Sequence, residues 1–137
     1  MRLFLDINIL LDIFLNREPH VEYSSRVFRL AEINQRQGFV SSTSYLTLHY
    51  VLSKQIGNSR STEILIKIRK ILQIAPVDEK VIDLALNSEF SDFEDGVQYY
   101  SAVMIDADNI ITRNKIDFNV ADQIPVLTPK EFLQHLK

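Results

Sequence analysis

The segment LFLDINILLD, residues 3–12, decides how this chain folds. It opens with three consecutive apolar residues, which is typical of a strand buried on both faces of a parallel sheet. The apolar run ends at Asp6, after which Ile9, Leu10 and Ile13 repeat at helical spacing. The pattern predicts a strand that ends at a carboxylate and turns into a helix within a few residues. Because ligands bind at the carboxyl ends of strands in open α/β sheets, Asp6 is a candidate for chemistry.

Short apolar strands and amphipathic helices alternate along the rest of the chain. Strands are predicted at residues 39–40, 73–77, 109–112 and 125–127, and helices at residues 21–37, 44–54, 62–72, 78–86, 94–104 and after Thr128. The second helix is expected to end at Gly38, because glycine commonly follows a helix C-terminus. This alternation predicts an α/β fold, a three-layer α/β/α sandwich with a mainly parallel central sheet, in a single domain of residues 1–137.

The composition excludes several classes of protein. The chain has no cysteine, so disulfide frameworks, thiolate metal sites and thiol catalysis are excluded, and any metal must bind oxygen or histidine. Its 15 basic and 18 acidic residues give a formal charge of -3. This charge does not indicate a general affinity for nucleic acid, but it permits a local basic rim. No N-terminal stretch has the pattern of a leader peptide and no apolar run approaches the ~20 residues that span a bilayer, so we expect a cytoplasmic protein without membrane contact.

Four acids stand at element ends near the apolar strands. Asp6 follows the first strand, Glu94 and Asp95 begin a helix, and Asp117 lies just past the fourth strand. Carboxylates packed into one crevice repel one another, so such a site makes physical sense only with a divalent metal, and oxygen ligands suit Mg²⁺ or Mn²⁺. A metal of this kind supports in-line displacement at a phosphodiester, which is nuclease chemistry.

Each acid also has a purely structural interpretation. Asp6 could cap the first helix without binding any ligand. Glu94 and Asp95 could be first-turn acids that the helix dipole favours, and Asp117 could brace its turn through its side chain. The spacing of the acids alone leaves both interpretations open.

The polar residues around these acids are similarly ambiguous. Asp12 lies one helical turn beyond Asn8, and we interpret Asp12 as structural support more readily than as a ligand. Arg113 and Lys115 flank the predicted crevice, where they either hold phosphate or are simply solvated surface.

Four segments together resemble a known family. LFLDINILLD, VSSTSYLTLHYVL, DFEDGVQYYSA and IITRNKIDF, in this order over nearly the whole chain, resemble the PIN domain family and particularly its small bacterial toxin ribonucleases of the VapC kind. The resemblance implies a parallel sheet flanked by helices and an acidic Mg²⁺ or Mn²⁺ site that cleaves RNA. It also implies the toxin of a toxin–antitoxin pair, present as a homodimer that binds a cognate antitoxin.

The resemblance assigns a role to several residues by position. Asp6, Asp95 and Asp117 match the catalytic metal ligands of the family, and Glu94 stands beside them as a further metal ligand. The remaining positions are supporting residues, Asn8, Thr47, Thr112 and Asn114, and substrate-binding residues, Arg113 and Lys115.

One position departs from the family pattern. The helix after the second strand usually carries a glutamate, and Thr47 occupies that register here. A hydroxyl adds no charge, so the metal would be held by one carboxylate fewer unless Glu94 compensates. The alternative function is therefore a catalytically weakened PIN-fold protein that acts as an RNA- or protein-binding module. Apolar helix faces and exposed aromatic residues such as Tyr23, Tyr45, Tyr50 and Tyr99 are expected to supply surface for a dimer and an antitoxin.

Overall fold

A central parallel sheet organises the computed structural model, which describes residues 1–136. Its strands are β1 (Arg2–Leu5), β2 (Gln37–Ser41), β3 (Gln73–Ala75), β4 (Asn109–Ile111) and β5 (Val126–Leu127). Within the described residues the five strands are all parallel, in the order β3-β2-β1-β4-β5. The predicted α/β class is confirmed, and β1 is the central strand.

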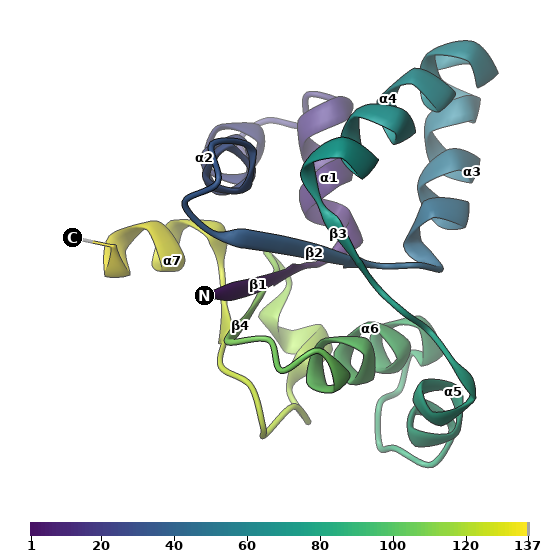
Figure 1. The fold of residues 1–137 in the computed structure, drawn as a ribbon, viewed down its shortest axis with the longest axis vertical. Helices are drawn as coiled ribbons and strands as arrows, with labels where there is room; N and C mark the ends of the chain where they lie inside the picture. Colours follow the sequence, from purple (N-terminus) through teal and green to yellow (C-terminus); the bar gives the residue numbers. More distant parts are fainter. Residues whose placement is uncertain (137) are drawn as a thin grey trace.

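Helices cover both faces of this sheet. They are α1 (Ile7–Phe14), α2 (Val21–Glu32), α3 (Ser44–Ile56), α4 (Asn58–Ile71), α5 (Glu79–Leu86), α6 (Phe93–Met104), the short 3₁₀ helix η1 (Lys115–Phe118) and α7 (Pro129–His135). Figure 1 shows α1 to α4 on one side of the sheet and α5 and α6 on the other, as the predicted three-layer sandwich requires. No helix found within residues 1–136 combines the length and apolar character that a membrane crossing needs.

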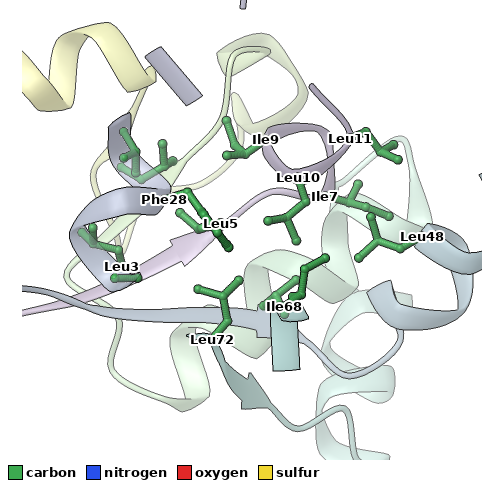
Figure 2. Packing of buried hydrophobic residues seen from close by; sticks show 14 of the residues in the cluster. Leu3, Leu5, Ile7, Ile9, Leu10, Leu11, Phe28, Leu48, Ile68 and Leu72 are labelled. Carbon is green, nitrogen blue, oxygen red and sulfur yellow. The ribbon is translucent and has the colours of Figure 1, made fainter. Parts of the chain in front are cut away.

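Two of the apolar clusters follow from the alternation of side chains along β1. Leu3 and Leu5 point to one face, where they pack with residues of α1, α2 and α4, as Figure 2 shows. Phe4 points to the opposite face and packs against α6, including the buried ring of Tyr99. The expectation that Tyr99 supplies exposed aromatic surface is therefore wrong. Its hydroxyl instead accepts backbone N–H bonds from Asp122 and Gln123, which anchors the segment before β5.

The predicted end of the second helix is also wrong. Helix α2 ends at Glu32, because Asn34 adopts a left-handed conformation with φ 61° and reverses the chain. Gly38 lies inside β2, where a Cβ atom would approach the Leu72 side chain to 2.6 Å. The glycine thus permits close packing of the sheet against the helices, and it does not end α2. Likewise, the helix predicted at residues 62–72 begins earlier, at Asn58, because Gly57 alone makes the turn with φ 87°.

Candidate active site

The site is built on the carboxyl ends of β1 and β4. These strands are direct neighbours, with Leu5 opposite Ile111, so the residues that follow them lie side by side. The backbone N–H of Asp6 donates to the carbonyl of Ile111 at 3.0 Å, and the Thr112 hydroxyl donates to Oδ2 of Asp6 at 2.8 Å. The Thr112 hydroxyl also accepts the N–H of Asn114 at 3.1 Å. Thr112 therefore connects Asp6 to the turn after β4.

Gln98 of α6 holds the other oxygen of the same carboxylate. Its Nε2 donates to Oδ1 of Asp6 at 3.0 Å, while its Oε1 accepts the N–H of Ile7 at 3.1 Å. Asp6 is only 3% exposed, and burial raises the pKa of its carboxyl group, whereas the bonds from Thr112 and Gln98 act to lower that pKa. Both oxygens of Asp6 are thus fixed by neutral donors.

The hydrogen bonds of the Asp6 side chain are not those of a helix-capping residue. Asp6 occupies the N-cap position of α1, yet within the described residues its side chain makes no capping bond to the helix. Gln98 was not predicted from the sequence. The signal was present, because Gln98 is a polar residue in the largely apolar stretch Val97–Tyr100 and lies one helical turn beyond Asp95.

The first turn of α6 brings further acids to this end of the sheet. Asp92 caps the helix by accepting the N–H of Asp95 at 3.0 Å, a role the sequence analysis did not assign. The pKa of Asp95 is raised to about 7, mainly by burial. Repulsion from nearby carboxylates adds to this effect, in decreasing order from Asp92, Asp6, Asp117 and Glu94. The predicted acids are therefore close enough to act on one another electrostatically.

Thr47 of α3 also lies at this crevice. Its hydroxyl donates to Oε2 of Glu94 at 3.0 Å, which joins α3 to the first turn of α6. The residue that replaces the usual glutamate is thus in direct contact with the acid that was expected to compensate for it. Asp117 is exposed on η1, and Asn8 is partly buried on α1.

The carboxylates do not form a closed metal cage. Among residues 1–136, no three His, Cys, Asp or Glu side chains are gathered tightly enough to hold a metal ion. In the same part of the chain, no Lys or Arg forms a salt bridge with Asp6, Glu94, Asp95 or Asp117. Oxygen donors that repel one another without a protein cation have the chemistry of a site for a divalent ion such as Mg²⁺ or Mn²⁺.

The two basic residues predicted to bind substrate are both in ion pairs. Nε of Arg113 lies 2.7 Å from Oδ2 of Asp12, which is fully buried, and Arg17 approaches Oδ1 of Asp12 at 3.7 Å. Lys115 lies 3.2 Å from Glu131 on α7. Asp12 thus gives structural support, as predicted, by tying the turn after β4 to α1. The guanidinium of Arg113 is not simply solvated surface.

Comparison with known proteins agrees with this architecture. The sequence profile of the PIN domain family matches residues 2–116. "Ribonuclease VapC1" of Aquifex aeolicus (strain VF5) is 29% identical over 138 residues, which cover 97% of this chain and 94% of that protein. Two solved structures share the fold. VapBC-1 from nontypeable Haemophilus influenzae matches with a TM-score of 0.70 and 15% sequence identity, and the match covers 95% of this chain and 99% of that chain. VapBC2 from Rickettsia felis, bound to a promoter DNA fragment, matches with a TM-score of 0.68 and 17% identity, and the match covers 92% of this chain and 97% of that chain. The family predicted from four sequence segments is confirmed, and this chain belongs to the PIN domain family.

Proposed function

We propose that this chain is a single-domain, divalent-metal-dependent endoribonuclease and the toxin of a toxin–antitoxin pair, acting in the cytoplasm. The observation that carries the proposal is the state of Asp6. A buried carboxylate at the end of the central strand, fixed on both oxygens by neutral donors and surrounded by further acids, is costly unless it serves a ligand. The similarity to a ribonuclease along almost the whole chain gives the substrate class.

Asp6, Asp95 and Asp117 would hold Mg²⁺ or Mn²⁺, with Glu94 as a fourth carboxylate. When bound, the metal supplies activated water and stabilises charge on the phosphodiester. Thr112 and Gln98 keep the Asp6 carboxylate in one orientation, so little reorganisation is needed when a cation arrives. Asp95 has a pKa of about 7 and must lose its proton to become a ligand.

The position of Thr47 bears on the alternative of a catalytically weakened binding module. That alternative follows from the missing glutamate charge. The bond from Thr47 to Glu94 offers a physical substitute, because the hydroxyl holds a carboxylate supplied by α6 at the same crevice. We therefore favour an active site in which α6, and not α3, supplies the fourth carboxylate.

The proposed partners are an antitoxin and a second copy of the chain. Similar solved structures include a toxin–antitoxin complex from Klebsiella pneumoniae, with a TM-score of 0.68 at 22% identity. Large apolar side chains are exposed on α3 and α4, namely Leu46, Tyr50 and Ile66. These residues supply apolar surface of the kind that partner binding buries.

Replacing Asp6 by asparagine tests the proposal. Asp6→Asn keeps the size of the side chain but removes the charge, so cleavage of single-stranded RNA in Mg²⁺ or Mn²⁺ should be abolished. Asp83→Asn, on the exposed face of α5, is the matched control and should cleave like the wild type. Wild-type cleavage that persists in excess EDTA would refute the metal dependence. An Asp6→Asn chain with full activity would refute the proposed active site at Asp6.

A further inference from the structure

Three adjoining hollows follow the junction of α2 and α7, which pack against each other (Figure 1). The first has a volume of about 270 Å³ and is lined by Tyr23, Arg113 and Lys130 among others. The second shares Tyr23 and Lys130 with the first and adds Arg26, and the third shares Arg26 and adds Arg29. Because neighbouring hollows share residues, they form one continuous surface. We call this the α2–α7 groove, lined by Tyr23, Arg26, Arg29, Arg113, Lys130 and Leu133.

Basic side chains outnumber acidic ones in the lining of this groove. Four cations line it, and within residues 1–136 the lining of the three hollows includes no Asp or Glu. The whole chain nevertheless carries a formal charge of -3. Arg113 and Arg29 have carboxylate partners, Asp12 and Glu32. A groove that collects cations in an acidic protein fits a polyanion.

The groove begins beside the candidate active site. Arg113 lines its first hollow and directly follows Thr112, whose hydroxyl bonds to Asp6. Lys130 lies in the first turn of α7, directly after β5, at the same edge of the sheet. A strand bound along α2 and α7 would therefore reach the turn after β4, which Thr112 joins to Asp6.

We propose that the α2–α7 groove binds single-stranded RNA on one side of the scissile bond, an inference that rests on the proposed ribonuclease function. Arg26 and Lys130 contact backbone phosphates, and the Tyr23 ring offers a stacking surface for a base. Nζ of Lys130 lies 5.9 Å from the centroid of that ring, so cation and aromatic face belong to one wall. Cations combined with an aromatic ring favour RNA over an acidic peptide, which needs only the cations.

The proposal is tested by the salt dependence of RNA binding. A short fluorescent single-stranded RNA is titrated in EDTA, which prevents metal-dependent cleavage, between ~50 and ~200 mM salt. Arg26→Gln combined with Lys130→Gln removes two phosphate contacts and should reduce the slope of log K against log salt by roughly 1.4. The matched control is Lys67→Gln combined with Lys70→Gln on the exposed face of α4, which should leave the slope unchanged.

Tyr23 is tested separately, because stacking is insensitive to charge. Tyr23→Ala should weaken RNA binding at least about fivefold, and Tyr23→Phe should retain wild-type affinity. The proposal would be overturned if the groove double variant and the α4 double variant lost RNA affinity equally, or if neither lost any. It would also be overturned by a groove double variant that still binds RNA but no longer binds a fluorescent oligoglutamate peptide, since that result identifies an acidic peptide as the occupant.

The inference and the function fail in distinguishable ways. If RNA binding depends on the groove but the wild-type chain never cleaves RNA with Mg²⁺ or Mn²⁺, the ribonuclease function is refuted and RNA binding in the groove is supported. Normal cleavage by a groove variant with unchanged RNA affinity retains the ribonuclease and refutes the groove.

Discussion

Asp6 and Asp12 are both buried, with 3% and 0% of their surface exposed, but the protein treats their charges in opposite ways. Two cations approach Asp12, Arg113 at 2.7 Å and Arg17 at 3.7 Å. Asp6 is held by the neutral donors Gln98 at 3.0 Å and Thr112 at 2.8 Å. Six residues apart on one segment, one carboxylate is neutralised and the other is oriented without being neutralised.

The difference indicates what each carboxylate is for. A buried ion pair fixes two elements to each other, here α1 and the turn after β4. An oriented but uncompensated carboxylate keeps its charge available for an external cation. Asp95 shares the lack of a countercharge, and burial, with added repulsion from neighbouring acids, raises its pKa to about 7.

The largest expected effect comes from breaking the ion pair. Asp12→Asn leaves the guanidinium of Arg113 without a countercharge and should destabilise the fold by about 3 kcal/mol, the low end for a buried pair because Arg113 keeps a quarter of its side chain exposed. Asp6→Asn is the matched comparison and should change the free energy of unfolding by no more than about 1 kcal/mol, since it also relieves the burial of a charge. Urea unfolding in EDTA measures both. Equal losses would contradict the contrast drawn between the two aspartates.

Sequence reasoning could place the carboxylates but could not identify their partners. Asp6 was predicted because a strand end and a helix start are local patterns, and both lie within ten residues. Gln98 and Arg113 lie 92 and 101 residues from the carboxylates they contact, and no periodicity reports such pairings. The capping box of α7 shows the opposite case, because Thr128 and Glu131 are three residues apart and their bonds were predictable.

The raised pKa of Asp95 makes the stability of the fold depend on pH. The folded chain binds this proton more tightly than the unfolded chain, whose pKa is near 3.8, so stability falls as the pH rises from about 4 through about 7. Asp95→Asn removes the ionisable group and should raise the melting temperature by a few degrees near pH 8 in EDTA, because solvent partly screens the repulsion at this partly buried position. The gain should shrink as the pH falls toward 5. A gain that is the same at both pH values would mean that the buried charge of Asp95 is not its cause.

The smallest expected effect concerns Thr47, which holds Glu94 as Thr112 holds Asp6, through a neutral hydroxyl. Thr47→Val keeps the branched shape and removes only the donor, so the free energy of unfolding should change by less than about 1 kcal/mol. Glu94 then loses its fixed orientation, and Mn²⁺ affinity should fall by no more than about tenfold, because Glu94 is exposed and solvent replaces the lost bond. Thr47→Ser keeps the hydroxyl and should bind Mn²⁺ like the wild type in calorimetric titration. If valine and serine at this position bind Mn²⁺ equally well, the hydroxyl does not present Glu94 to the metal.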